Sequence, residues 1–439
     1  MIKILNKHIK QISDGGLIVF LKKIKSLCIL IFQLPIYIAS IPIIIIIRIL
    51  KPFYLIRWRE LYSSRIGHFA KETELHLSEA FLDKSYKNKK ILDIFFLGKF
   101  KANNQLVKMW KRRTTIIPRF FMVPLFRVNN FLNIFFPSGK DHEIKWKAIS
   151  KRNMLRDIFN VLEKTKPNLS FTDEEHILGK KFLKQFGLNE KDKFVCLIVR
   201  DSAYLSTKDP QRDWSYHDYR NSDIENYFLA AEELTKKGYF VFRMGTHVSK
   251  QFHSKNKMII DYANSNLRSD FMDIYLSAHC KFAISTATGL DEVTCVFRKP
   301  ILYTNVAPLA IIETHNSNSI ILFKEYFSNQ SKNKLTLKEI LDQGLSTLTH
   351  GDEFNQRNIK LIDNSPQDIL QAVIEMDEKI ELKWINDQSD LNLQSKFWEI
   401  FKNNKVLLEY QKNRGFLHGE IKSKISSNFL KKNKYLLSQ

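Results

Sequence analysis

Short apolar runs and longer amphipathic segments alternate along most of the chain after residue 53. Toward the N-terminus, this pattern predicts strands at 54–61 and 90–97 and helices at 69–82 and 103–113. Further on, it predicts strands at 194–200, 239–244, 257–262, 281–285 and 300–305, with helices near 224–237, at 270–279 and from residue 290. Apolar strands that alternate with helices are typical of parallel sheets covered on both faces. The predicted fold class is therefore α/β, with two Rossmann-like domains.

An uncharged apolar stretch runs from Ser26 to Ile47. About 20 apolar residues span a bilayer as a helix, and the stretch starts too late for a typical cleaved signal peptide. Pro35 and Pro42 disfavour one straight helix, so a broken helix that enters one leaflet competes with a span. Basic residues flank both ends, which favours a hairpin that returns to the cytoplasmic face of the inner membrane. We expect attachment at that face, either peripheral (monotopic) or by a single span.

Local signals complete the division of the chain. Thr172 to Glu175 fits a capping box that opens a helix, and Gly187 closes it. Residues 114–150 are aromatic, basic and irregular, and no element is predicted there. The helical pattern returns at 367–379, at 391–403 and in a basic terminal segment. We expect a membrane-associated segment at 1–50, Rossmann-like domains at 51–188 and 189–380, and basic helices at 381–439.

The charge of the chain is strongly positive and unevenly distributed. There are 69 Lys and Arg against 46 Asp and Glu, a net charge of +23, concentrated at 1–66, between Asp93 and Asp141, and at 402–434. This balance implies anionic partners, and an anionic membrane surface is one of them. Nucleic acid is not expected because no nucleic-acid-binding module is recognisable, although the aromatic and basic stretch 95–136 would support an RNA-binding alternative. Cys196 and Cys280 are interpreted as buried reduced thiols in a reducing compartment.

Polar and basic residues follow the strands of the second domain, at the edge where open parallel sheets bind ligands. The candidate residues there are Arg200, Asp201, Tyr219, Arg220, Asn221, Arg243, Gly245, Ser285, Thr286, Thr288 and Gly289. Small hydroxyl residues and glycine before a helix let backbone N–H groups approach phosphate oxygens. Arginine can bind a diphosphate through two hydrogen bonds, or it can form a structural ion pair. This edge is predicted to hold the diphosphate of a nucleotide.

Several well-known motifs are absent from the sequence. The Gly-x-Gly-x-x-Gly fingerprint and the Walker A loop are missing, which disfavours a dehydrogenase or an ATPase. No Asp-x-Asp motif follows a strand of the second domain, so no metal site is expected. Arginines and backbone amides are the economical alternative for stabilising a leaving group. No cofactor is expected besides a nucleotide-sugar donor that acts as co-substrate.

In the first domain, the strand at 54–61 leads into Arg65, Gly67 and His68. An imidazole at such a turn can serve as a general base near neutral pH, or it can hydrogen-bond locally. Gly67 is expected to allow the turn. Glu72 and Glu74 are expected on a solvated face of the following helix, and the alternative for Glu74 is a position that faces a cleft.

With these residues in place, the chain resembles a family of bacterial surface-carbohydrate glycosyltransferases with two Rossmann-like domains, the GT-B arrangement. The likeness covers roughly residues 50–435 and rests on the segments 65–68, 219–227, 243–245, 268–275, 282–289, 299–305 and 428–433. Arg200 and Asp201 also resemble the strand-end motif of fucosyltransferases, although Ile198 stands where those enzymes have His. The resemblance implies a donor held by the C-terminal domain, an acceptor held by the N-terminal domain, and a reaction in the cleft between them.

The sequence thus predicts a metal-independent glycosyltransferase that moves a sugar from a nucleotide sugar to a lipid-linked or other glycan acceptor in surface polysaccharide biosynthesis. His68, with Arg65, is expected to act on the acceptor, while Arg200, Arg243 and the turn at 285–289 neutralise the departing diphosphate. Replacing Arg243 by Ala is expected to remove transfer and to leave the fold intact. Two alternatives stay open: transfer of another group, such as pyruvate or phosphate, to a cell-surface glycan, and a non-catalytic basic protein that binds RNA or membrane.

Overall fold

The computed structural model describes residues 2–83, 90–145, 155–414 and 417–438. The chain forms two compact units that interleave in sequence. The small unit contains Met1–Leu61, Lys84–Gly98 and Thr114–Lys145, and the large unit contains Tyr62–Asp83, Lys99–Arg113 and Trp146–Gln439. The helices that follow the first two strands along the chain therefore belong to the large unit.

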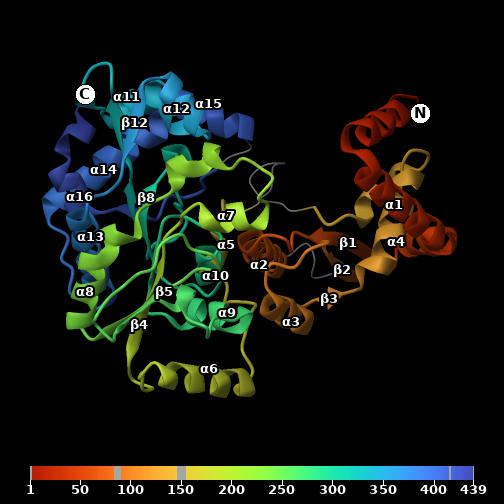
Figure 1. Ribbon diagram of the computed structural model, residues 1–439, viewed down its shortest axis with the longest axis horizontal. Coiled ribbons are helices and arrows are strands. Elements are labelled where there is room, and N and C mark those ends of the chain that lie inside the picture. Colours follow the sequence, from red (N-terminus) through yellow and green to blue (C-terminus); the bar gives the residue numbers. More distant parts are fainter. Residues whose placement is uncertain (1, 84–89, 146–154, 415–416, 439) are drawn as a thin grey trace. The chain divides into compact units, whose positions relative to one another are not determined.

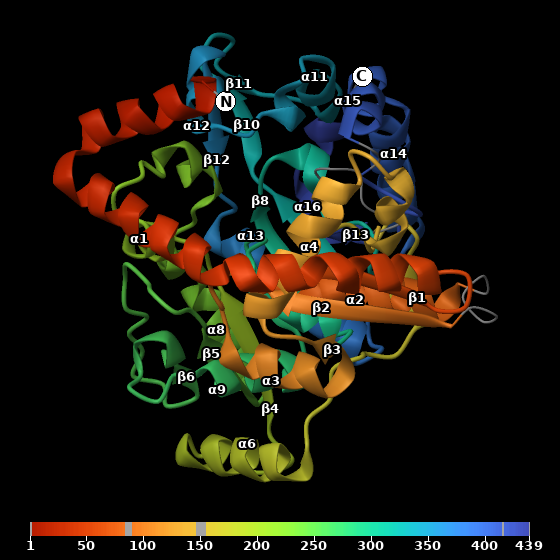
Figure 2. The ribbon, with the colours of Figure 1, turned by 90° about the vertical axis from the view of Figure 1, so that its right-hand side faces the viewer.

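The small unit combines a long apolar helix with a parallel sheet (Figures 1 and 2). Its elements are the helices α1 (Ile2–Leu50) and α4 (Arg119–Leu132), a 3-10 helix at Pro137–His142, and the strands β1 (Leu55–Leu61), β2 (Ile91–Leu97) and β3 (Thr115–Ile116). The sheet order is β1-β2-β3, and every pairing is parallel. The core joins Ile44 of α1, Trp58 of β1, Phe96 of β2 and Met122 of α4. Part of the segment for which the sequence predicts no element is thus the helix α4.

Helix α1 bends at Gly16, whose φ of 58° lies in the left-handed region that glycine tolerates. Pro35 and Pro42 lie inside the helix and cause no such departure from helical geometry. The alternative of a helix broken at the prolines is therefore not what the structure shows. The apolar helix itself is confirmed, since the part from Ile9 to Leu50 is long and apolar enough to cross a membrane.

The large unit is built on a seven-stranded parallel sheet of order β13-β9-β8-β7-β4-β5-β6 (Figure 1). Its strands are β4 (Lys193–Ile198), β5 (Tyr239–Arg243), β6 (Ile259–Ile260), β7 (Ala283–Ser285), β8 (Ile301–Val306), β9 (Ile320–Phe323) and β13 (Lys424–Ile425). The five predicted strands are present, although the third is reduced to two residues. The sequence reasoning missed β9 and β13.

Helices surround this sheet. They are α2 (Ile66–Leu82), α3 (Asn104–Arg113), α5 (Val161–Lys164), α6 (Asp173–Gln185), α7 (Ala203–Lys208), α8 (Phe228–Lys236), α9 (Asp270–His279), α10 (Asp291–Val296), α11 (Leu337–Asp342), α12 (Gly351–Gln356), α13 (Pro366–Ile380), α14 (Gln388–Asn403), α15 (Lys405–Arg414) and α16 (Ser427–Lys432). The predicted capping box at Thr172 is confirmed at the start of α6. Ser215–Arg220 and Ile224–Tyr227 form 3-10 helices before α8.

Alternate residues of each strand point to opposite faces of the sheet. Val195 and Leu197 of β4 lie in the apolar cluster that includes α8 and α13. Phe194, Cys196 and Ile198 lie in the cluster that includes α6 and α9. Both faces are therefore covered, which confirms the predicted α/β class, and Cys196 is buried as expected.

A small antiparallel sheet follows β9 and was not predicted. Strand β10 (Glu325–Ser328) pairs with β11 (Asn333–Lys334) on one side and with β12 (Ile359–Ile362) on the other. The helical C-terminal part is confirmed. Helices α13 and α14 both begin with capping boxes, at Ser365 and Asp387.

Candidate active site

The strand order of the large sheet defines one topological switch point. From β6 to β9 the order corresponds to 3-2-1-4-5-6 along the chain, the doubly wound arrangement in which ligands bind where the order reverses. The reversal lies between β4 and β7. There the backbone N–H of Arg200, just beyond β4, donates to Oγ1 of Thr286, just beyond β7, at 2.9 Å. The carboxyl ends of these two strands therefore mark the candidate active site.

The turn from Ser285 to Gly289 is held from within by Asp291. The Ser285 hydroxyl donates to the Asp291 carboxylate at 2.7 Å, and the Thr288 N–H donates to the same oxygen at 3.0 Å. Burial raises the pKa of Asp291. Ala287 at the tip has a φ of 56°, and the Thr286 hydroxyl is engaged by Arg200. The groups that the sequence offered to a phosphate are thus already hydrogen-bonded, and α10 places its own acids in its first turn.

Two arginines meet at this turn. Arg220 donates to the carbonyl oxygen of Ala287 at 2.7 Å. Burial lowers the pKa of Arg200 to about 10, and the neighbouring positive charge of Arg220 lowers it further in the same direction. In the part of the chain that the structure describes, neither guanidinium forms an ion pair with a carboxylate. Asp218 and Asp201 oppose this shift only partly, so the two adjacent cations are incompletely compensated, which favours binding of an anion.

Three buried polar atoms without hydrogen-bond partners lie in this short region. They are Nε of Arg200, Nδ1 of His217 and Oδ1 of Asn221. Burial and then the charge of Arg200 lower the pKa of His217 to about 4, so its imidazole is neutral at pH 7. Buried polar groups are nearly always paired in native proteins. Their concentration here makes this region the candidate binding site.

Aromatic rings form a stack beside the arginine pair. Trp214 stacks on Tyr216 with ring centroids 6.1 Å apart, and Tyr216 stacks on His350 at 5.0 Å. The Arg212 guanidinium lies 4.2 Å from the centre of the Trp214 ring. Tyr219, by contrast, packs against the apolar core beside Phe354. The stack supplies flat ring surface next to the unpaired positive charge.

Arg243 lies at the end of β5 and is almost completely buried (1% exposed). It donates to the Asp261 carboxylate at 3.2 Å and lies 3.9 Å from the carboxylate of Asp201. Burial lowers its pKa. Asp201 in turn accepts hydrogen bonds from the backbone and hydroxyl of Ser249. Arg243 thus has structural ion-pair partners, and together with Asp201 it lines a small cavity of ≈ 120 Å³.

Gly245 follows Arg243 in a turn that requires glycine. Its φ is 155°, and a Cβ there would lie 2.6 Å from a methyl group of Val248. The expected role of Gly245 at the site is therefore explained locally by backbone geometry.

His68 lies in the first turn of α2 and forms a pair with Glu72 one turn later. Its Nδ1 contacts the Glu72 carboxylate, and its ring lies 5.0 Å from that of Tyr62. Glu72 is buried, so the expectation of a solvated helix face is wrong. A carboxylate on Nδ1 favours the tautomer whose Nε2 is free to accept a proton. Arg65 is exposed at the N-cap of the same helix.

The start of α2 lies directly against the turn after β7. A Cβ on Gly67 would lie 3.0 Å from both Cα and the carbonyl oxygen of Gly289. The prediction that Gly67 serves only to allow a turn is wrong, because its role is this close approach of two backbones. Because Gly67 contacts Gly289, the next residue, His68, lies near the turn after β7. Arg220 donates to the carbonyl oxygen of Ala287 in the same turn.

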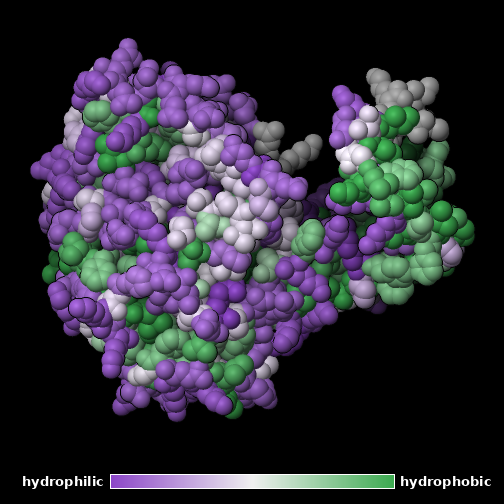
Figure 3. All heavy atoms as spheres, viewed as in Figure 1, coloured by the Kyte–Doolittle hydropathy of each residue, from purple (hydrophilic) through white to green (hydrophobic). Residues whose placement is uncertain are grey.

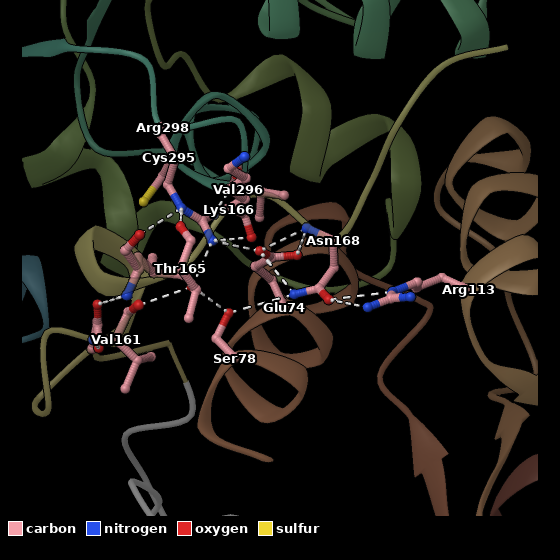
Figure 4. A network of polar contacts seen from close by, with 12 residues as sticks. Glu74, Ser78, Arg113, Val161, Thr165, Lys166, Asn168, Cys295, Val296 and Arg298 are labelled. Carbon is pink, nitrogen blue, oxygen red and sulfur yellow. Dashed lines mark hydrogen bonds and ion pairs between the residues drawn. The ribbon is translucent and has the colours of Figure 1, made fainter. Parts of the chain in front are cut away.

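A buried polar network fixes α2 in the large unit (Figure 4). The Glu74 carboxylate accepts from Arg298 at 2.6 Å and from the backbone N–H of Asn168 at 3.1 Å. Arg298 also donates to the carbonyl oxygen of Leu162 at 2.7 Å, and the hydroxyl of Thr165 donates to that of Ser78 at 3.0 Å. Glu74 is fully buried, so it neither lies on a solvated face nor faces a cleft.

A second buried ion-pair cluster lies under the first turn of α2. Lys71 is fully buried and contacts Glu292 at 2.8 Å and Glu313 at 3.4 Å, and Arg156 contacts Glu313 at 2.5 Å. The two acids raise the pKa of Lys71 against the opposing effect of burial, which is the largest single influence. The sequence reasoning missed this cluster because its partners are far apart along the chain.

No group of three or more His, Cys, Asp or Glu side chains that could hold a metal ion occurs among the described residues.

No protein-family model matches the chain, and no curated protein matches it in sequence. Among solved structures, the chain is similar to E. coli ADP-heptose heptosyltransferase II (13% identity, 74% of this chain and 100% of that chain, TM-score 0.36). It is also similar to a family 9 glycosyltransferase from Veillonella parvula (12% identity, covering 76% of this chain and 99% of that chain, TM-score 0.42). E. coli heptosyltransferase WaaC is a further similar structure (11% identity, covering 56% of this chain and 88% of that chain, TM-score 0.28).

At these low identities and TM-scores, the likeness carries no argument about activity. The neighbours belong to the class that the sequence motifs resemble, bacterial glycosyltransferases.

Proposed function

We propose that this protein is a glycosyltransferase that moves a sugar from a nucleotide-sugar donor to a glycan acceptor in bacterial surface polysaccharide biosynthesis. The observation that carries the proposal is the pair Arg200 and Arg220 at the switch point of the large sheet. Neither cation is ion-paired with a carboxylate among the described residues, and Nε of Arg200 and Nδ1 of His217 have no hydrogen-bond partner there. A diphosphate would supply the missing charge and the missing hydrogen bonds.

In the proposed reaction, the two arginines stabilise the charge that develops on the departing nucleoside diphosphate. Preorganised cations in a partly buried site cost little reorganisation when this charge appears, so they lower the barrier without a metal ion. Arg243 acts indirectly, because it is ion-paired with Asp261 and holds Asp201 beside the end of β4. The turn from Ser285 to Gly289 positions the arginines through the carbonyl of Ala287 and the hydroxyl of Thr286.

The proposed general base is His68. Glu72 holds Nδ1 of the imidazole, so Nε2 is available to take the proton of an acceptor hydroxyl, and the buried carboxylate stabilises the imidazolium that forms. Arg65 is exposed beside it and is proposed to orient an anionic acceptor. The acceptor that fits an apolar, basic chain is a lipid-linked glycan at the cytoplasmic face of the inner membrane.

The donor site is tested by thermal shift and calorimetry with ADP, UDP, GDP and CDP. We expect one of them to bind the native protein, and we expect Arg200→Ala and Arg220→Ala each to weaken that binding by roughly 10- to 100-fold, the value of one charge-assisted hydrogen bond. Arg357→Ala is the matched control, since Arg357 is exposed at the C-cap of α12 and donates to the carbonyl of Gln343. Equal affinity of all three variants would remove the basis of the proposal.

The base is tested separately from the donor site. Once the donor is known, His68→Ala should lower kcat by roughly 10²- to 10⁴-fold and leave nucleotide affinity unchanged. Glu72→Gln should lower kcat less, because the imidazole keeps its position but the imidazolium that forms loses its counter-charge. An unchanged kcat for His68→Ala would show that another group takes the proton.

A further inference from the structure

The C-terminal half of the apolar stretch is part of the core of the small unit. Ile44 is fully buried (0% exposed), and Tyr37 and Ile47 pack against the same cluster. At the end of the stretch, the Arg48 guanidinium donates to the side chain and to the backbone carbonyl of Asn129 on α4, both at 2.9 Å. This half of α1 is therefore fixed along one face to folded protein.

Although the whole segment from Ile9 to Leu50 is long and apolar enough to cross a membrane, the half that is not fixed to the small unit is too short to cross one alone. The uncharged residues that precede Tyr37 run from Ser26 to Ile36, about 11 residues, and a helix of that length rises about 16 Å. The hydrocarbon core of a bilayer is about 30 Å thick. Lys22, Lys23 and Lys25 lie immediately before this segment, so the apolar part cannot be extended in that direction.

The opposite face of the fixed half-helix is exposed and apolar. Ile38, Ile45, Ile46 and Ile49 are all exposed. A helix that faced water on this side would carry polar residues there. The face is therefore suited to an apolar environment along its length.

Helix α4 and the turn after it add a second apolar element. Phe131 at the end of α4 and the consecutive residues Ile134, Phe135 and Phe136 are exposed, the last two by 62% and 64%. Figure 3 shows a largely hydrophobic surface over α1 and α4. Exposed aromatic residues of this kind are typical of segments that enter the boundary between head groups and acyl chains.

The net positive charge of the small unit favours an anionic partner. Its sequence segments contain 18 Lys or Arg and 5 Asp or Glu, a net charge of +13 out of the +23 of the chain. A second copy of the same surface would be repelled by this charge. Anionic lipid head groups would be attracted to it.

We propose that the small unit is a monotopic membrane-docking module, in which the exposed face of α1 and the turn Ile134–Phe136 enter one leaflet of an anionic bilayer together. Both ends of the apolar stretch then stay on the same side of the membrane. The proposal rests on the small unit alone, so it stands or fails independently of the transferase assignment.

The topology is tested with single cysteines in the full chain. In a Cys28→Ser background, Lys10→Cys and Lys140→Cys place one exposed thiol on each side of the apolar stretch. A membrane-impermeant maleimide is applied to intact spheroplasts and to inverted membrane vesicles. Labelling of both positions from the same side supports the proposal, and labelling from opposite sides overturns it in favour of a span.

The turn is tested by vesicle flotation of the full chain. Phe135→Ser/Phe136→Ser should weaken binding to mixed phosphatidylcholine–phosphatidylglycerol vesicles by roughly tenfold or more, since two large apolar side chains leave the lipid. The matched control is Phe81→Ser/Phe100→Ser, which removes two exposed phenylalanines of the large unit. Equal binding of the two double variants overturns the role of the turn. Binding of the small-unit surface to RNA or to a second copy, without binding to vesicles, overturns the whole proposal.

Discussion

The contact between Gly67 and Gly289 determines whether Gly67→Ala raises or lowers the free energy of unfolding. In Gly67→Ala, the new Cβ would lie 3.0 Å from Cα and from the carbonyl oxygen of Gly289, and 3.2 Å from Cγ of Glu292. Carbon atoms in ordinary contact are about 3.5–4.0 Å apart. The Glu292 side chain can move, but the Gly289 backbone cannot yield alone. The start of α2 and the turn after β7 must therefore separate by a few tenths of an ångström.

Two effects of this substitution oppose each other. Replacing Gly by Ala at a helical position without a clash stabilises a protein by about 0.4–1 kcal/mol, because the unfolded chain loses freedom. Overpacking of a closely packed contact costs about 1–3 kcal/mol. We expect the second effect to dominate and Gly67→Ala to be destabilised by about 1–2 kcal/mol. Because His68 is the next residue, we also expect transfer to fall by roughly 10- to 100-fold, in line with the cost of misplacing a catalytic group by up to about 1 Å.

Urea unfolding of three alanine variants tests this reasoning. Gly351 also lies in the first turn of a helix, and its Cβ would meet nothing closer than 3.7 Å. Gly351→Ala is therefore expected to be neutral or stabilising. Gly289→Ala, with nearest contacts at 3.3 Å and 3.4 Å, should fall between the two. If Gly67→Ala is as stable as Gly351→Ala, the close approach of the two backbones does not constrain the site.

Three further predictions concern charge. Glu74→Gln leaves Arg298 without its buried counter-ion and should lower the free energy of unfolding by about 3–5 kcal/mol in urea titrations, whereas Glu74→Gln/Arg298→Met should recover part of the loss. Burial lowers the pKa of His418 to about 3. The stability that the neutral imidazole contributes is therefore complete above pH 6.5 and is lost as the pH falls toward 3, by up to about 1.4 kcal/mol per pH unit. His418→Gln should flatten this dependence of the free energy of unfolding on pH between pH 4 and 6, and an unchanged slope would contradict the assignment. A bound nucleoside diphosphate should neutralise Arg200 and raise the pKa of His217 from about 4, which NMR titration with and without nucleotide can measure; an unchanged pKa would place the ligand elsewhere.

The sequence predicts the central elements well because their signal is local. Apolar runs of strand length and amphipathic helices specify the inner strands of the large sheet, and Thr172 with Glu175 specifies the start of α6. Strands of two residues, such as β6 and β13, carry almost no periodic signal. Gly16 was overlooked as the bend of α1 because prolines are the stronger local signal, yet Pro35 and Pro42 are both accommodated within the helix.

The site was predicted less completely because the partners of its charges are distant in sequence. The sequence suggests that Glu74 is solvated, because its ion-pair partner Arg298 lies 224 residues away along the chain. The sequence suggests that Arg243 is a phosphate ligand, whereas in the structure it donates to the Asp261 carboxylate. The strand-end rule nevertheless predicted Arg200 and Arg220 at this edge of the sheet, where the structure places them, since the rule depends only on the order of strands and loops.

The position of β13 in the sheet has a consequence for how the protein is made. This strand, Lys424–Ile425, pairs with β9 and closes one edge of the large sheet. Helix α1 leaves the ribosome roughly 370 residues earlier, which at about 5–20 residues per second is roughly 20–75 s. During that interval the apolar helix is exposed while the large sheet is incomplete. A nascent chain that reaches a bilayer in this window would shield α1 from aggregation before the large unit has folded.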